Sequence, residues 1–565
     1  MRMRFRGWCL MLALVAGVAQ AGQNNSATQS TQPDSSAASS LTPEMMYDYL
    51  VMQVAAQRGQ WPVACQMALR LAEQNADPQL AETAFQVSVY AGNRAAAQRA
   101  AELWLHDDPH SSQALHATIG VLLAGKHPAE ALPYIHQLLA EKPDMAGQLF
   151  LQLDPMFATQ PDKTAAWTLM QGLAQEYPRL PEAQLVLAQL AARAGHFDAA
   201  LAALKTVSRL KPGWDLAAKL QFEVLQQTNP TVAGAFMADY LKQYPNANDV
   251  RLMYARYLVN KGQIAAARDQ FSALAQALPD NAQIQIALGM VSLQTNDFTT
   301  AGTAFRQALQ HNYPDPGLPE VYLGQIAEAQ HHDKEAADWY QDVGPGPQYL
   351  LARVRYAALL ARQGKLEKAR AVLQDTQTDS DDDRVKLIRA EAQLLHEAGQ
   401  DKAAYGVLDA ALSTRPDSID LLYDHALMAE NIGRIDVAER DLRHLLALQP
   451  NHAQALNALG YTFADHDVHL NQAVDLLQKA LALDPDDPFI LDSMGWAQYR
   501  LGHFGQAESY LQRAYDASKD PEIAAHLGEV LWKQGKFSQT HDLWQRAQSV
   551  SPDNAVLKAA VQKFK

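Results

Sequence analysis

The sequence predicts an all-α protein made of about fifteen helix-turn-helix units, because three kinds of residue recur together along most of its 565 positions. Glycine or a substitute turn residue, proline, and alanine each return at intervals of roughly one helical pair. Self-similarity at a fixed period of this length is the sequence signature of an α-solenoid. The repeats account for the chain from about residue 43 to its last lysine.

The turns form the first series. Apolar residues at helical spacing flank glycine or a turn substitute at intervals of 33 to 36 residues. A tight turn between two helices commonly needs a residue that adopts the left-handed conformation, and glycine does so most readily. We therefore predict one turn in the middle of each unit. The positions are 59, 92, 125, 159, 195, 228, 262, 296, 331, 364, 399, 433, 467, 502 and 535.

Prolines and alanines form the second and third series, and both keep the same interval. Proline stops a helix, so its recurrence predicts the breaks between units. These prolines are Pro109, Pro143, Pro178, Pro212, Pro245, Pro279, Pro314, Pro347, Pro416, Pro450, Pro485 and Pro552. Alanine stands five positions after ten of the fifteen turns, which predicts a close approach of two helix axes there. These alanines are Ala64, Ala97, Ala200, Ala267, Ala301, Ala336, Ala369, Ala404, Ala438 and Ala507.

The late repeats resemble the tetratricopeptide repeat (TPR) family. The segments "ALNALGYTFADHDVHLNQAVDLLQKALALDP", "FILDSMGWAQYRLGHFGQAESYLQRA" and "EIAAHLGEVLWKQGKFSQTHDLWQRAQSVSP" each carry Leu or Met before Gly, then a turn, a small residue, an aromatic residue or Leu, and a closing Ala. This resemblance implies a right-handed TPR superhelix, continuous over residues 43–565. Within it, Gly495, Gly502 and Ala507 are expected to be structural residues.

The N-terminal segment has the pattern of an export signal. Residues 1–21 combine three arginines, an apolar run and small residues before Gly22, which predicts a cleaved signal peptide. Residues 22–42 are rich in Ser, Thr and Gln and predict a flexible linker. Cys9 precedes the apolar run instead of following it, so no lipid anchor is expected. We expect an exported, periplasmic protein, with an association with the outer membrane left open.

Charge and cysteine content narrow the classes of partner. The formal net charge is -15, and loss of the three N-terminal arginines would make it -18. Such a chain repels phosphate backbones, so we do not expect a nucleic-acid partner. Cleavage leaves only Cys65, which lies among apolar residues at helical spacing and is expected to be buried and unreactive.

Catalytic signatures are missing from the sequence. We find no phosphate-binding loop of the G-x-x-x-x-G-K type, no H-E-x-x-H and no G-x-S-x-G. The repeats leave no segment of domain size for a catalytic domain. We therefore expect no enzyme, no cofactor and no metal. A metal-dependent enzyme using His466 and His469 remains the weaker alternative, since these residues stand beside Asp467 in a predicted turn.

Aromatic residues on the first helices of the late units are the candidate binding residues. In the TPR family, the equivalent positions line the concave groove, and a spacing of three places Trp496 and Tyr499 on one face of their helix. Packing against the next repeat is the alternative reading of these rings. The candidate protein-binding residues are Asn457, Tyr461, Asp492, Trp496, Tyr499, Arg500, Glu529, Trp532 and Lys533.

A narrower resemblance concerns function. The segments "DPDDPFILDSMGWAQYRLG" and "DPEIAAHLGEVLWKQGK" are similar to the C-terminal repeats of envelope TPR lipoproteins of Gram-negative bacteria. This resemblance implies a non-catalytic adaptor that brings substrates, such as cell-wall hydrolases, to a periplasmic carboxyl-terminal processing protease. A scaffold subunit of an envelope polysaccharide export or assembly machine is the alternative from a different functional class.

Overall fold

The computed structural model describes residues 42–125 and 128–564, and over these ranges it contains 31 α-helices, two short 3-10 helices and no β-strand. The all-α fold class predicted from the repeats is confirmed. The predicted signal peptide, and all of the predicted linker except Thr42, lie outside the described residues. None of the described helices has the length and apolar character needed to cross a membrane.

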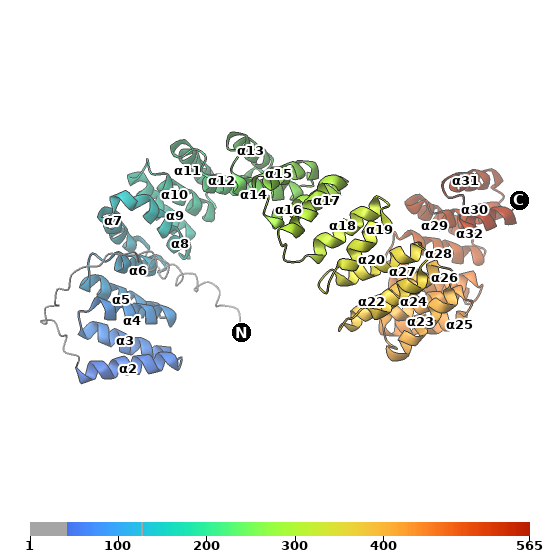
Figure 1. Cartoon of the computed structure of the whole chain (residues 1–565), viewed down its shortest axis with the longest axis horizontal. Helices are drawn as coiled ribbons and strands as arrows, with labels where there is room; N and C mark the ends of the chain where they lie inside the picture. Colours follow the sequence, from blue (N-terminus) through green and yellow to red (C-terminus); the bar gives the residue numbers. More distant parts are fainter. Residues whose placement is uncertain (1–41, 126–127, 565) are drawn as a thin grey trace. The chain divides into compact units, whose positions relative to one another are not determined.

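The chain divides into two compact units at Tyr240 and Leu241. In the first unit, helices follow one another as antiparallel pairs along the chain (Figure 1). Its helices are α2 (Pro43–Gln57), α3 (Trp61–Gln74), α4 (Pro78–Tyr90), α5 (Arg94–Asp107), α6 (Ser112–Leu123), η1 (Pro128–Ala131), α7 (Leu132–Glu141), η2 (Pro143–Met145), α8 (Ala146–Ala158), α9 (Lys163–Glu176), α10 (Pro181–Arg193), α11 (Phe197–Leu210) and α12 (Asp215–Thr228). Helix α13 (Pro230–Gln243) runs across the division.

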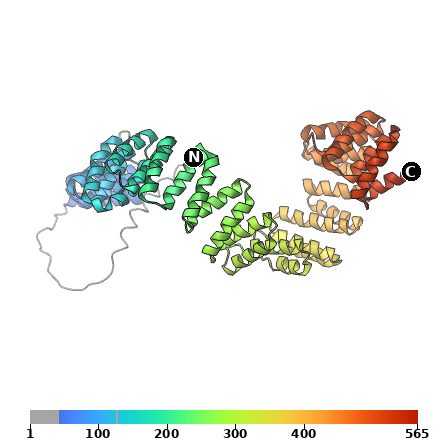
Figure 2. The same ribbon diagram turned by 90° about the horizontal axis from the view of Figure 1, so that it is seen from above.

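The second unit continues the same pairing, as the second view also shows (Figure 2). Its helices are α14 (Asn248–Asn260), α15 (Ile264–Ala277), α16 (Ala282–Gln294), α17 (Phe298–Gln310), α18 (Gly317–Ala329), α19 (Asp333–Asp342), α20 (Tyr349–Arg362), α21 (Leu366–Asp375), α22 (Asp381–Glu397), α23 (Asp401–Thr414), α24 (Ile419–Asn431), α25 (Ile435–Leu448), α26 (Ala453–Asp465), α27 (Leu470–Leu483), α28 (Pro488–Arg500), α29 (Phe504–Ser518), α30 (Pro521–Lys533), α31 (Phe537–Val550) and α32 (Ala555–Lys563). The described helices therefore make fifteen pairs, followed by α32.

The predicted turns coincide with the observed ones. All fifteen positions fall at the junction between the two helices of a pair. Twelve of them have positive φ: nine are glycines, and the other three are Asn296, Asp467 and His331. Asparagine and aspartate tolerate the left-handed region better than most residues, which explains two of the substitutes. His331 and the group of His466, Asp467 and His469 thus lie at turns.

Small residues allow the two helices of a pair to approach closely. All ten predicted alanines are buried. Gly495 on α28 is equally restrictive, because an added Cβ would lie 2.5 Å from Leu511 Cγ and 3.2 Å from the Ala507 carbonyl oxygen. Gly502, at the following turn, has a φ of 81°. The predicted structural roles of Gly495, Gly502 and Ala507 are confirmed.

Three of the predicted turn positions, 125, 159 and 228, lack positive φ and lie in the first unit, and side chains close the turns at the first two. The buried Gln160 side chain donates from Nε2 to the carbonyls of Leu123, at 2.8 Å, and Gly125, at 3.2 Å. The Lys163 ammonium donates to the carbonyl oxygens of Ala158 and Gln160 at 2.8 and 2.7 Å. These side chains satisfy carbonyl groups at the ends of α6 and α8, where a helix leaves its last acceptors unpaired.

The expectation for Cys65 is also confirmed. The thiol is buried in α3, where Sγ lies 3.7 Å from the Val87 carbonyl oxygen. Burial raises the pKa of Cys65, and the neighbouring Ser88 hydroxyl opposes this only in part. A buried thiol with a raised pKa forms little of the nucleophilic thiolate. Cys65 therefore behaves as a small apolar residue of the core.

Candidate protein-binding face

The nine candidate residues come from α26, α28 and α30, the first helices of three consecutive pairs in the second unit. Helix α28 packs directly against α26 and α30. The term candidate face is used below for these nine residues: Asn457, Tyr461, Asp492, Trp496, Tyr499, Arg500, Glu529, Trp532 and Lys533. They divide into a buried set and a set that reaches solvent.

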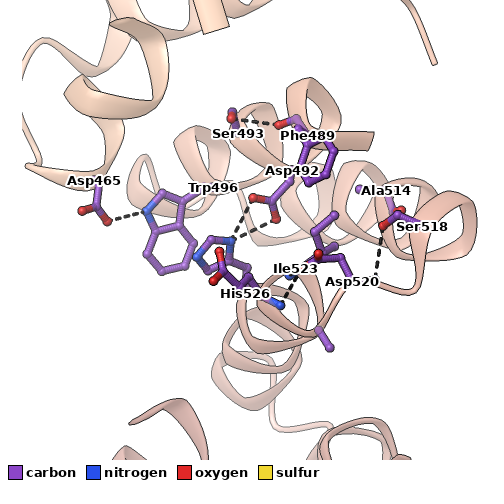
Figure 3. Close-up of polar contacts among 12 residues, drawn as sticks. Asp465, Phe489, Asp492, Ser493, Trp496, Ala514, Ser518, Asp520, Ile523 and His526 are labelled. Atoms are coloured by element: carbon purple, nitrogen blue, oxygen red, sulfur yellow. Dashed lines mark hydrogen bonds and ion pairs between the residues drawn. The ribbon is translucent and has the colours of Figure 1, made fainter. Parts of the chain in front are cut away.

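Trp496 belongs to the buried set, with 7% of its surface exposed. Its indole Nε1 donates to Asp465 Oδ1 on α26 at 3.2 Å. Its ring stacks on the His526 ring of α30, with centroids 4.3 Å apart and an interplanar angle of 24°. Figure 3 shows the indole lying between these two partners. Trp496 therefore links three consecutive first helices.

Asp492 is the second buried member, and it binds His526. Both carboxylate oxygens lie 3.0 Å from His526 Nδ1, and His526 is 8% exposed (Figure 3). Burial alone would lower the pKa of His526, but the Asp492 carboxylate, with smaller contributions from Glu529 and Asp465, raises it above its ordinary value. An opposite charge within hydrogen-bonding distance favours the charged form of a histidine.

Glu529 completes the buried set. Its carboxylate accepts from Lys563 Nζ of α32 at 3.1 Å. Burial and the nearby Glu529 carboxylate together raise the pKa of Tyr499, whose ring lies 4.9 Å from that of Trp496. Tyr499 is only half-buried, so one part of its ring packs on Trp496 and another part is exposed to solvent.

Tyr461 lies among several carboxylates. Burial raises the pKa of Tyr461, and the surrounding carboxylates of Asp465, Asp492 and Glu430 add to this effect. Burial also raises the pKa of Glu430, against the hydrogen bond that its carboxylate accepts from Thr462 Oγ1 at 3.1 Å. Several acidic groups therefore share the environment of one partly accessible ring.

The remaining candidates lie at the edges of the candidate face. Asn457 is partly buried, and its Oδ1 has no hydrogen-bond partner. Arg500 pairs with Asp467 at 3.4 Å. Lys533 is exposed, and the half-buried Trp532 ring contacts Phe537 with centroids 4.6 Å apart. Tyr461, Tyr499, Arg500, Trp532 and Lys533 are thus the members that a partner could contact without unfolding the face.

His526 contacts Asp492 and Trp496 of the candidate face but was not predicted from the sequence. Its alanine-rich surroundings in α30 give no local sign of function. A signal nevertheless exists, because Asp492 and His526 are 34 residues apart, which is one repeat period. Two residues that are one repeat period apart in the sequence occupy the same position on neighbouring first helices, and can therefore contact each other.

The arrangement offers recognition chemistry. Half-exposed aromatic rings and carboxylates can bind a peptide by apolar contact, hydrogen bonds and charge. In residues 42–125 and 128–564, no group of three or more His, Cys, Asp or Glu side chains is placed to hold a metal ion. His466 Nδ1 instead lies 3.0 Å from the Thr462 carbonyl, and the ring of His469 packs on Phe463.

Comparison with known families matches a model described as "Tetratricopeptide repeat" to residues 252–319, 423–488 and 493–539. The last two matches include every residue of the candidate face except Asp492. The chain is 31% identical over 492 residues to "TPR repeat-containing protein PA4667" of Pseudomonas aeruginosa, and the match covers 86% of this chain and 82% of that protein.

Two further proteins are similar to this chain at lower identity. "Cellulose synthase operon protein C" of Pseudomonas fluorescens is 24% identical over 299 residues, covering 49% of this chain and 23% of that protein. A solved tetratricopeptide repeat protein from Parabacteroides merdae is 14% identical, with a TM-score of 0.34, covering 50% of this chain and 97% of that one.

Proposed function

Since the chain belongs to the tetratricopeptide repeat proteins, we propose that it is a non-catalytic scaffold that binds a segment of a partner protein across the candidate face. The carrying observation is that Tyr461, Tyr499 and Trp532 are half-buried on three successive first helices. Rigid aromatic residues flanked by charged groups are the usual anchors of protein interfaces.

The buried side chains beneath these rings support the proposal. Trp496 is fixed by a hydrogen bond and a ring stack, and Tyr499 packs on it. A surface whose anchors are already held in place loses little conformational freedom when a partner binds. The candidate face therefore needs no large rearrangement to present its rings.

The charge of the face favours one kind of segment. Asp465, Asp492 and Glu430 surround Tyr461, and burial already raises the pKa of Glu430. A partner segment carrying lysine or arginine can bring a cation to Asp465 and Glu430, which are not buried, and to the face of the Tyr461 ring. An acidic segment would meet repulsion from the same groups, although Arg500 and Lys533 offer it two cations at the edge.

The finer proposal is an envelope adaptor. The similarity of the last repeats to envelope TPR lipoproteins supports a role in bringing cell-wall hydrolases to a periplasmic carboxyl-terminal processing protease. Holding protease and substrate on one chain would raise their effective concentration without chemistry by the scaffold. This role requires export, which the sequence of residues 1–21 favours.

A scaffold in an envelope polysaccharide machine is the second candidate. It is favoured by the similarity to "Cellulose synthase operon protein C", which covers about half of this chain. Both candidates use the same chemistry at the candidate face, and they differ in the partner that would be recovered.

Affinity capture tests the proposal. Residues 22–565 serve as bait in envelope extract, alongside a Tyr499→Ala/Trp532→Ala variant and a Tyr515→Ala control on the second helix α29 of the same region. We expect proteins that the wild type and the control retain and the double variant loses. Recovery of a carboxyl-terminal processing protease with cell-wall hydrolases supports the adaptor, whereas glycan-synthesis proteins support the second candidate.

Two results would oppose the proposal. If the double variant folds and captures the same partners as the wild type, the candidate face is not the binding surface. If Tyr515→Ala loses the same partners as the double variant, the effect arises from the stability of the repeats and not from contact. Circular dichroism of each variant confirms that its helices are intact.

A further inference from the structure

His526 joins the last two first helices of the candidate face through a buried polar contact. Its Nδ1 lies 3.0 Å from both Asp492 oxygens, although the two residues belong to different repeats. The imidazole is also stacked on Trp496, which is itself bonded to Asp465 of α26. One titratable side chain therefore sits where α26, α28 and α30 converge (Figure 3).

The charged groups around His526 are almost all acidic. Asp492 approaches from α28 and Asp465 from α26, where the Tyr461 ring also lies with its centroid 6.5 Å from that of the His526 ring. Glu529 lies on the same helix as His526, and its charge is partly offset by Lys563 of α32. With the imidazole neutral, the buried Asp492 carboxylate would lose the positive charge of its partner, which is costly.

From this geometry we infer that the His526 imidazolium is a pH-dependent clamp between α28 and α30, so that the candidate face is held in register when His526 is protonated and loosens when it is neutral. The consequence for partner binding rests on the proposed function, but the clamp itself does not. Its loss would free Trp496 on one side, and with it the support of Tyr499.

The direction of the pH dependence follows from the raised pKa of His526 in the folded protein. An unfolded histidine has a pKa of about 6.5. The stabilisation is fully present below that unfolded pKa, and it is lost as the pH rises through the higher folded pKa. The repeats at the end of the second unit should therefore weaken as the pH rises above the ordinary histidine pKa and through the higher pKa of folded His526.

The test compares thermal midpoints of the full chain and of His526→Asn at about pH 6 and about pH 9, on either side of the unfolded histidine pKa. Asparagine keeps a donor near the position of Nδ1 but has no charge to lose. We expect the midpoint of the wild type to exceed that of His526→Asn clearly at the lower pH and much less at the higher one. His444→Asn is the matched control, because His444 makes a similar 2.9 Å contact to Asp417 on the surface.

A difference between wild type and His526→Asn that is the same at both pH values would overturn the inference, as would an equal pH dependence of His444→Asn. If His526→Asn does not fold, the wild type alone still decides. The tryptophan fluorescence of the wild type minus that of Trp496→Phe should titrate with a midpoint above about 6.5. A midpoint at or below that value, or no titration, would reject the clamp. None of these measurements involves a partner, so a failed clamp and a failed binding face give separate results.

Discussion

The pairs formed by α6 to α9 and those formed by α26 to α29 occupy the same number of repeats but are closed by different means. In the later pairs, the turn residues Asp467 and Gly502 adopt positive φ, and the helices meet over glycine and alanine. In the earlier pairs, residues 125 and 159 lack positive φ, and Gln160 and Lys163 bond to the freed carbonyls.

This difference shows that the repeat period fixes where a turn lies and not how it is stabilised. A left-handed residue lets the backbone satisfy its own last carbonyls. A buried side-chain amide can also donate to these carbonyls, but the side chain must then be held in place by its surroundings. The earlier pairs should therefore depend on individual polar side chains, whereas the later pairs depend on close packing.

We expect the largest loss of stability from a substitution that disrupts the close packing of a later pair. Leu511 packs directly against Gly495, and Leu511→Ala should cost about 2–5 kcal/mol of local stability because it leaves a cavity. Amide hydrogen exchange of α28 and α29 measures this cost. Adding Gly495→Ala should recover part of the loss, since the new methyl group enters the vacated space. A double variant as unstable as the sum of the two single changes would contradict close packing as the cause.

We expect a smaller loss of stability when a polar side chain is removed from an earlier pair. Gln160→Ala should cost about 1–3 kcal/mol, because the Leu123 carbonyl would lose its partner in a buried place. Hydrogen exchange in α6 and α8 measures the change. Gln393→Ala is the control, since Gln393 is exposed and bonds only to Glu397. If exchange in α6 and α8 is unaffected, the turns are not closed by Gln160.

We expect the smallest changes in stability from substitutions at the turn residues themselves, and these compare the two kinds of turn directly. Gly502→Ala forces a methyl-bearing residue to a φ of 81° and should cost about 1–2 kcal/mol. Thr159→Ala, at the equivalent position, should change stability by less than about 0.5 kcal/mol, because Thr159 is exposed with a φ of -75°. Thermal midpoints of the two variants should differ in this order. Equal midpoints would remove the distinction between the two kinds of turn.

Much of the fold is readable from the sequence because its determinants are local and repeated. The glycines and alanines recur at fixed offsets, so each copy supports the assignment of the next. Gln160 was not predictable in this way, since a single polar residue after a helix carries no periodic signal. Its role depends on the carbonyl of Leu123, which lies 37 residues earlier.

The candidate site was predictable in its location and less so in its internal structure. Placing Trp496 and Tyr499 on one helical face was possible from spacing alone, but spacing does not distinguish a ring that is covered from one that is open. Trp496 is covered because the next repeat presents His526 to it. Burial of this kind depends on which side chain arrives from the neighbouring helix, and that is a tertiary property. Whether the nine residues bind a partner stays a prediction.

The polar bonds along the candidate face share one property with consequences for folding. Each of these hydrogen bonds joins two residues that are about one repeat apart in the sequence. The separations are 32 residues for Thr462 and Glu430, 31 for Trp496 and Asp465, 34 for His526 and Asp492, and 34 for Lys563 and Glu529. Each such link closes a loop of about one repeat, so the entropic cost of forming it does not grow with the length of the array. Low contact order of this kind favours fast nucleation at several places and unfolding in sections. We therefore expect the chain to unfold in sections, so the thermal midpoints named above are those of the section that carries each substitution.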